Sequence, residues 1–195
     1  MRPETLLAKF GLKGINYSQG GGGKGIFSLE EQLAMVGISW KESPVGFLIL
    51  FTEIHKDFHS RKMLEPVVML ELINMTAKNR GQKSELAYKA IVQVAITEAT
   101  SQLGQICPTC NGSGYYKTER RQKRNCTFCN EGRIQWDEHS RFAALVSDGK
   151  FRCTYSVFKR KYLPILQQLT CWLSDQRTIA MLALMERIKR EEEAA

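Results

Sequence analysis

Residues 107–132 read CPTCNGSGYYKTERRQKRNCTFCNEG, so two Cys-x-x-Cys pairs enclose a basic stretch. The pairs Cys107/Cys110 and Cys126/Cys129 are separated by 15 residues, which is within the spacing of a four-cysteine zinc site. Two thiolates on one tight turn can both reach a single ion, and two such turns facing each other complete a tetrahedron. We therefore predict that these four cysteines hold one structural Zn²⁺ ion.

Glycines follow both pairs: Gly112 and Gly114 after the first, and Gly132 after the second. They predict turns with positive φ, in which the backbone folds back over the sulfurs. Nothing in the stretch indicates a fifth ligand or an open coordination position, so the predicted zinc is structural and not catalytic. An iron–sulfur cluster uses the same ligands and stays open. A thioredoxin-type redox site would be a single Cys-x-x-Cys that opens a helix.

The segment between the two pairs is basic and begins with two tyrosines, Tyr115 and Tyr116. A solvated loop tip is the simpler interpretation of such a run. A rigid zinc support in a basic protein favours phosphate contact to the same degree. The candidate phosphate-contacting residues are Lys117, Arg120, Arg121, Lys123 and Arg124.

Downstream of the cysteines, apolar spacing predicts a helix over 137–146, a turn at 147–150 and a longer helix from Thr154 to about Trp172. Pro164 is expected to kink or split the longer helix. A last helix is predicted from Ser174 to about Arg190. The first two helices with their turn are typical of a helix-turn-helix, whose second helix reads DNA from its N-terminal end. The predicted DNA-contacting residues there are Arg152, Tyr155, Ser156, Lys159, Arg160 and Lys161.

Positive charge is concentrated around these two features. Residues 115–165 contain 12 Lys/Arg and five Asp/Glu, a difference of +7, whereas the whole 195-residue chain carries +8. An ordinary amphipathic helix pair is the alternative for 137–172. The placement of the charge favours DNA binding.

Upstream of the cysteines the chain is expected to be helical, with a capping box at 28–31 and helices over 45–58, 65–78 and 84–103, the last preceded by a turn at 79–82. Residues 1–27 are expected to be a flexible segment. The glycines at 20–23 do not form a P-loop, because position 18 is Ser and position 25 is Gly. The predicted fold class is mainly α: a helical bundle with an inserted four-cysteine zinc-binding hairpin and a helix-turn-helix-like C-terminal part. Its segments are 1–27, 28–105, 106–134 and 135–195.

The overall composition favours a polyanionic partner. No apolar run approaches the roughly 20 residues of a membrane span, and the N-terminus shows no export signal, so we expect a cytosolic protein with no membrane partner. Cys153 and Cys171 are predicted to be packed thiols. His55 and His59 are predicted to be surface residues on one helical face. No nucleophile–base pair stands out, which predicts neither an enzyme nor a small-molecule substrate.

The order of these elements resembles the lambdoid phage late-gene antitermination protein Q family. The likeness is carried by CPTCNGSG, CTFCNEG, the helix-turn-helix-like segment and AMVGISWKESPVGF at 34–47, and it covers nearly the whole chain. It implies a protein that binds double-stranded DNA at the late promoter and engages host RNA polymerase holoenzyme in a paused elongation complex. The polymerase then reads through pauses and terminators.

Two departures and one alternative accompany this resemblance. In the second pair the glycine is displaced, giving Cys-Asn-Glu-Gly at 129–132, and the glycine run at 20–23 is not typical of the family. CxxCxGxG knuckles also occur in the zinc region of DnaJ-type chaperones, so the alternative is a DnaJ-like chaperone or adaptor that binds polypeptide. That alternative predicts a His-Pro-Asp motif or further knuckles, and the sequence contains neither.

Overall fold

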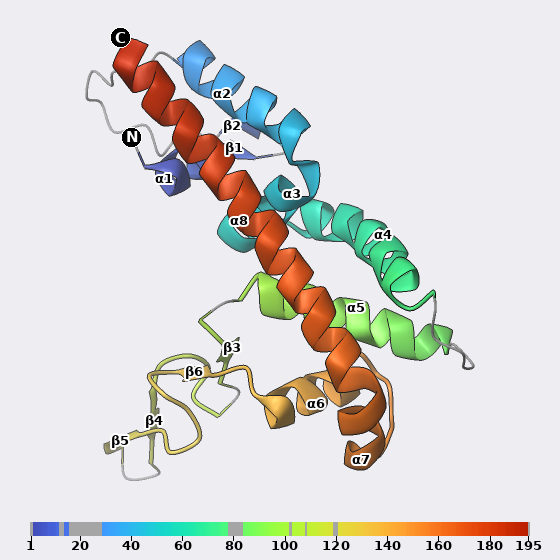
Figure 1. Cartoon of the computed structure of the whole chain (residues 1–195). Coiled ribbons are helices and arrows are strands. Elements are labelled where there is room, and N and C mark those ends of the chain that lie inside the picture. The colour runs from blue at the N-terminus through green and yellow to red at the C-terminus, as the bar shows by residue number, and fades with distance from the viewer. Residues whose placement is uncertain are drawn as a thin grey trace. The chain divides into compact units, whose positions relative to one another are not determined.

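The computed structural model describes residues 2–11, 14–15, 29–77, 84–101, 103–107, 109–118 and 121–194. Within these ranges the chain is mainly helical, as predicted, and it also contains short two-stranded antiparallel sheets (Figure 1). The expected glycine linker, the cap at Ser28 and the turn at 79–82 lie outside the described residues. The chain divides into two compact units: unit 1 is residues 1–73 with 169–195, and unit 2 is residues 74–168. None of the described helices has the length and apolar content needed to cross a bilayer.

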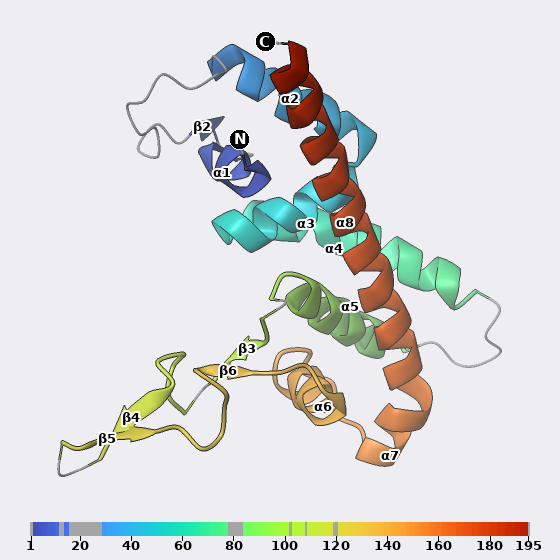
Figure 2. The ribbon, with the colours of Figure 1, turned by 60° about the vertical axis from the view of Figure 1, so that its left-hand side comes forward.

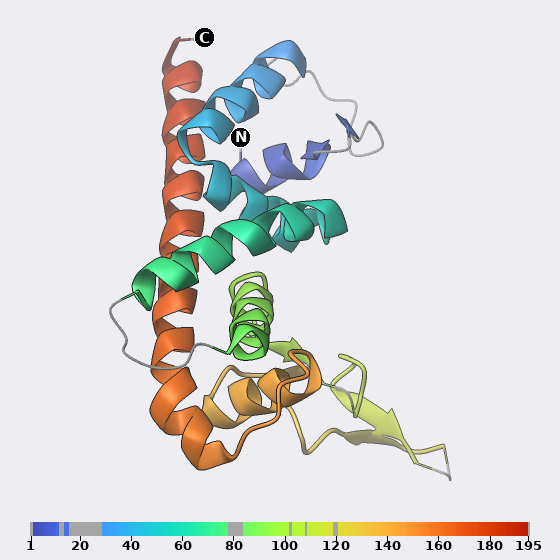
Figure 3. The ribbon, with the colours of Figure 1, turned by 90° about the vertical axis from the view of Figure 1, so that its right-hand side faces the viewer.

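Unit 1 contains α1 (Pro3–Lys9), the short strands β1 (Phe10–Gly11) and β2 (Gly14–Ile15), α2 (Leu29–Glu42), α3 (Pro44–His55), most of α4 (Phe58–Met75) and the larger part of α8 (Leu163–Ala194). The C-terminal half of α8 runs beside α2 and α3 (Figures 1 and 3). One apolar core joins these elements: Leu6, Leu7, Phe10, Met35, Val36, Phe47, Leu50, Phe51, Ala180, Leu184 and Ile188.

Residues 169–195 therefore belong with the N-terminal helices. A Cβ atom at Gly46 would lie 2.2 Å from the Gln176 carbonyl oxygen, so α3 and α8 approach closely because position 46 is glycine. Beside this crossing, the Arg177 guanidinium donates to the Glu53 carboxylate at 2.6 Å.

The predicted helix over 45–58 is wrong at its C-terminal end. It stops at His55 because Lys56 adopts a left-handed φ of 53°, and Asp57 then caps α4 by accepting from the Ser60 amide at 2.8 Å. The helix expected from 65 consequently starts at Phe58. The prediction of one helical surface for His55 and His59 is also wrong, because His55 ends α3 and His59 lies in α4. His59 is exposed as predicted, whereas His55 is half-buried and its Nε2 lies 2.7 Å from the Leu7 carbonyl oxygen, which ties α3 to α1.

Unit 2 is built on α5 (Glu85–Ala99) and α6 (Glu138–Ser147), which pack against each other (Figure 2). Ser84 caps α5, close to the predicted start, and the helix ends four residues before the predicted 103. A buried ion pair joins the helices, because Nε of Arg141 donates to the Glu98 carboxylate at 2.9 Å. The predicted turn at 147–150 lies against α5, where a Cβ at Gly149 would meet the Ala90 methyl at 2.6 Å.

The prediction of two separate C-terminal helices, at 154–172 and 174–190, is wrong. After α7 (Tyr155–Val157) and a π-helix (Phe158–Tyr162), α8 runs unbroken from Leu163 to Ala194. Pro164 neither splits nor ends it. The amide of Leu163 instead bonds to the Phe158 carbonyl five residues back, so a wide turn precedes the proline, which has no N–H to donate. Of the two lone cysteines, Cys153 is half-buried and Cys171 is exposed, so the packed-thiol prediction is wrong for Cys171.

Asp137 caps α6 and supplies a first testable prediction. Its carboxylate accepts from the Ser140 amide at 2.6 Å, and this bond is the main reason that the pKa of Asp137 is lowered. We expect Asp137→Ala to lower the free energy of unfolding by about 1 kcal/mol near neutral pH. Because its pKa is lowered, the Asp137 carboxylate stabilises the fold at pH values above its ordinary pKa of 3.8. This stabilisation is lost as the pH falls through the folded-state pKa. Urea unfolding at pH 7 and pH 3 checks this, since the variant should differ less from the parent protein at the lower pH.

Candidate metal centre

The cysteine hairpin, residues 105–134, connects α5 to α6 and contains two successive strand pairs (Figure 2). Its base is the strand pair β3 (Gln105–Ile106) and β6 (Arg133–Ile134), and its outer part is β4 (Tyr115–Lys117) paired with β5 (Lys123–Asn125). The Trp136 indole N–H donates to the Ser101 carbonyl at 3.0 Å and anchors this base beside the end of α5.

The four cysteine sulfurs meet inside the hairpin. All four Sγ atoms lie within 4.8 Å of one another, with Cys107 and Cys126 at 3.9 Å and Cys110 and Cys129 at 3.5 Å. A tetrahedral ion with ligands at about 2.3 Å requires sulfurs about 3.8 Å apart. A disulfide would require only about 2.05 Å. The predicted cysteines therefore form one cluster whose geometry fits a structural metal ion.

The backbone holds the two cysteine pairs together reciprocally. The amide of Cys107, the first ligand of its pair, donates to the Gly132 carbonyl at 2.9 Å. The amide of Cys126, the first ligand of the other pair, donates to the Gly114 carbonyl at 2.8 Å. Each ligand turn is thus closed by the glycine turn of the other pair, so the frame around the metal is built jointly by both.

The glycines adopt the positive φ values that the sequence predicts: 83° at Gly112, 75° at Gly114 and 88° at Gly132. The displaced glycine of the second pair also has a physical explanation. Asn111 and Gly112 are two consecutive left-handed residues, and Glu131 with Gly132 repeat this pair one position further from the last cysteine. The two ligand turns therefore end in the same backbone conformation despite their different sequences.

Hydrogen bonds and burial give the thiols unequal acidities. Burial raises the pKa of Cys107, but amide donors from Cys110 and Thr109 and the neighbouring thiols outweigh burial and bring it down to about 6. The pKa of Cys129 is raised to about 12, first by burial and then by hydrogen bonds with the side chains of Cys126 and Cys110. Four thiolates this close together repel one another, so a cation is required to hold all four.

The basic side chains of the outer strands are exposed. Lys117 lies directly opposite Lys123, an arrangement that is unfavourable without an anionic partner, and Lys123 Nζ lies 3.5 Å from the Tyr115 ring centroid. Among the described residues, Lys117, Arg121 and Arg124 form no salt bridge. Arg120, the fifth predicted contact, lies outside the described part of the chain.

The second set of predicted DNA-contacting residues, at 152–161, falls into two groups: two contact Glu138, and the other four do not. Lys159 Nζ lies 2.8 Å from the Glu138 carboxylate, and the Tyr155 hydroxyl donates to the same carboxylate at 3.1 Å. Lys159 is the main cause, before Tyr155, of the lowered pKa of Glu138. The remaining members are exposed: Arg152, Ser156, Arg160 and Lys161.

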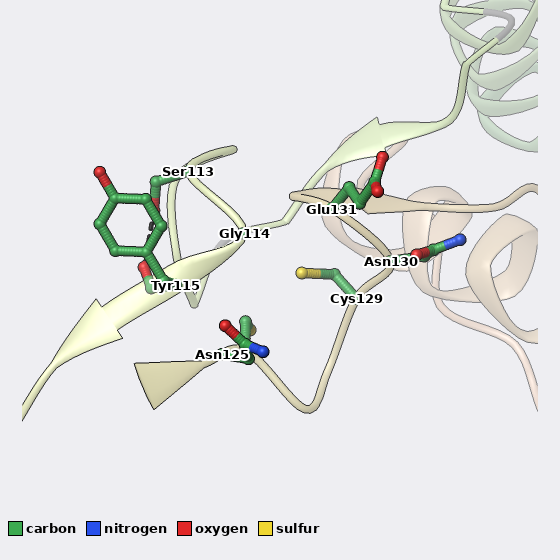
Figure 4. A pocket seen from close by; sticks show the side chains of 8 residues that line it. Ser113, Gly114, Tyr115, Asn125, Cys129, Asn130 and Glu131 are labelled. Carbon is green, nitrogen blue, oxygen red and sulfur yellow. Dashed lines mark hydrogen bonds between the residues drawn. The ribbon is translucent and has the colours of Figure 1, made fainter. Parts of the chain in front are cut away.

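An open cleft lies beside the cluster on the side of Cys126 and Cys129, with a volume of about 490 Å³ (Figure 4). Tyr115 on β4 and Asn125 on β5 border it on one side, and the turn Cys129 to Glu131 borders it on the other. The sequence analysis did not predict this cleft. The residues that form it are local to the hairpin, but only the pairing of β4 with β5 brings Asn125 opposite Tyr115.

Glu138 was also missed, because a glutamate at a helix start is explained by the helix dipole alone. Comparison with known proteins adds no further assignment: no family model and no curated protein matches the chain. The functional interpretation therefore depends on the residues described above.

Proposed function

We propose that this protein is a phage transcription antitermination factor that binds DNA at a late promoter, engages paused RNA polymerase and makes it read through pauses and terminators. The resemblance to the protein Q family supplies the biological role. Nucleic-acid binding is supported by one observation, which is how charge is distributed between the two compact units.

Unit 2 contains 16 Lys/Arg and seven Asp/Glu, whereas unit 1 contains 12 Lys/Arg and 13 Asp/Glu. The excess is +9 in unit 2 and −1 in unit 1, so unit 2 accounts for the basic character of the whole chain. A polyanion is attracted to unit 2, and unit 1 offers no comparable electrostatic attraction.

Within unit 2 we assign DNA contact to two surfaces. One is the outer part of the cysteine hairpin, with its exposed cations. The other is the segment from α6 through α7 and the π-helix, which we interpret as helix-turn-helix-like, with Arg160 and Lys161 exposed on the π-helix. Glu138 holds Tyr155 and Lys159 in place beside them.

We assign zinc to the cysteine cluster. Four thiolates in tetrahedral proximity are typical of structural Zn²⁺ sites. An iron–sulfur cluster contains several irons that spread the cysteines apart, whereas these four sulfurs all lie within 4.8 Å of one another. The zinc fixes the hairpin, and no chemistry at the metal is required.

Arg160→Ala is the test of DNA contact by the second surface. We expect the dissociation constant for double-stranded DNA to rise about fivefold at moderate salt. The slope of log K against log salt should fall by about one, because one phosphate contact is lost. Lys62→Ala, an exposed cation of unit 1, serves as the control and should change neither quantity. An unchanged salt slope in Arg160→Ala would contradict this assignment.

Transcription in vitro tests the complete role. Bacterial RNA polymerase is run through a terminator from the late promoter of the genome that encodes this chain, with and without the protein, and a promoter without the flanking DNA site serves as control. We expect readthrough to increase only with the protein and only on the first template. Equal readthrough on all templates would refute antitermination.

A further inference from the structure

We propose that the cysteine hairpin binds an unpaired nucleic-acid strand, with one base placed in the cleft beside Tyr115. This rests on the proposed function for the class of ligand, and it goes further by naming the form of nucleic acid that the hairpin recognises. The argument depends on the aromatic side chains of the hairpin, on the cleft and on its rigid frame.

Three aromatic rings are exposed on the hairpin, beside its cations. Tyr115 is 37% exposed, Tyr116 38% and Phe128 72%. A duplex offers phosphates to cations but keeps the faces of its internal bases stacked. An unpaired strand offers both phosphates and base faces, and aromatic rings interleaved with Lys and Arg are the usual surface for it. The hairpin therefore fits single strands better than a surface of cations alone would.

The cleft supplies a place for one base. A volume of about 490 Å³ falls in the range of small-molecule sites and admits a nucleobase with its sugar. Its lining combines the Tyr115 ring with the side-chain amides of Asn125 and Asn130 (Figure 4). Side-chain amides donate and accept hydrogen bonds, which suits the edge of a base that is not already paired.

The frame of the cleft is rigid. Cys126 and Cys129 belong both to its lining and to the cysteine cluster, so the proposed metal ion fixes one wall. On the opposite wall the Ser113 hydroxyl lies 2.6 Å from the carbonyl oxygens of Cys110 and Tyr115. Lys123 over the Tyr115 ring brings a cation next to the stacking surface, within reach of the phosphate of a bound nucleotide. Little reorganisation is needed on binding.

Fluorescence anisotropy with the full-length, metal-loaded protein tests the proposal. The probes are labelled 12-nucleotide single strands of DNA and of RNA, and a DNA duplex of the same sequence. We expect Phe128→Ala to weaken single-strand binding at least about fivefold, which is the loss of one stacked base, while duplex binding changes less than twofold. The DNA and RNA probes distinguish the two sources of an unpaired strand, and preferential binding of either one supports the proposal.

Phe58→Ala is the matched control, because Phe58 is 73% exposed and lies on α4 in unit 1. It should leave all three affinities unchanged. Asn125→Ala provides a second variant inside the cleft. Tested on four further 12-nucleotide probes, each a homopolymer of one base, it should reduce the differences in affinity among them. Metal content of one ion per chain in each variant shows that the frame is intact.

Two results would overturn the inference. In the first, Phe128→Ala and Phe58→Ala bind every probe equally. In the second, Phe128→Ala loses affinity for an unfolded polypeptide but not for oligonucleotides. If duplex binding and terminator readthrough persist in either case, the proposed function stands and the inference alone fails. If single strands bind through Phe128 but readthrough is absent, the inference stands and the proposed antitermination role fails.

Discussion

Cys126→Ser is expected to reduce bound metal from one ion per chain to well below one, and to abolish the fold of the cysteine hairpin. Structural zinc contributes on the order of 10 kcal/mol to the small domains that it organises, and a tetrahedral thiolate site does not tolerate the loss of a ligand. The hairpin buries little besides the sulfurs themselves, so few contacts remain to hold it once the metal leaves. The apolar core of unit 1 contains no hairpin residue and should keep its helices.

Metal analysis and amide hydrogen exchange measure these two effects. In Cys126→Ser, exchange should become fast over residues 105–134 and stay slow in α3. Cys171→Ser is the matched control, since Cys171 is an exposed cysteine outside the cluster, and it should keep one metal ion. A Cys126→Ser protein that still binds one ion per chain would disprove the four-cysteine site.

Gly132→Ala is expected to weaken metal binding by roughly 100-fold, although it alters no ligand. A Cβ atom at this position would lie 2.1 Å from the Gly112 carbonyl oxygen, and the φ of 88° is strained for any residue with a side chain. Strain and overpacking together cost about 3 kcal/mol. The Gly132 carbonyl also accepts from the Cys107 amide, so a shift of this turn displaces the first ligand.

Competition with a chromophoric chelator measures this loss of affinity. Gly37→Ala is the control, because position 37 lies inside α2 and no atom would contact the added methyl group within 4 Å. That variant should bind metal normally and unfold at slightly higher denaturant, since alanine favours a helix over glycine. If Gly132→Ala and Gly37→Ala bind metal with similar affinity, the close approach of Gly132 to Gly112 is not needed for metal binding.

The metal ligands were predictable because the whole site is local. Thirty residues of sequence contain all four thiols and the glycines that turn around them, and the structure confirms both. The α5 and α6 helices were predictable for a similar reason, because Ser84 and Asp137 mark their starts with side chains that accept from nearby amides.

The failures occurred where a distant partner decides the local structure. Ser174 has the side chain of a helix cap, but α8 continues through it because this segment packs against α2 and α3. His55 is polar and near a helix end, yet it is half-buried against the carbonyl groups of Leu7 on α1 and Phe10 on β1. The ion pair of Lys159 with Glu138 was also not predicted, because the sequence gives no sign that these residues, 21 positions apart, lie together.

The reciprocal hydrogen bonds donated by the Cys107 and Cys126 amides have an evolutionary consequence. Each ligand turn is completed by the other, and the hydrogen bonds that close this frame involve no residue of the tip between Lys117 and Lys123. That tip contains none of the four cysteines, and its described backbone hydrogen bonds run from the Thr118 amide to the Gln122 carbonyl and from the Arg121 amide to the Thr118 carbonyl. Insertions, deletions and charge changes there should be inherited without loss of the metal, so related chains can diversify what they recognise while they keep one invariant scaffold.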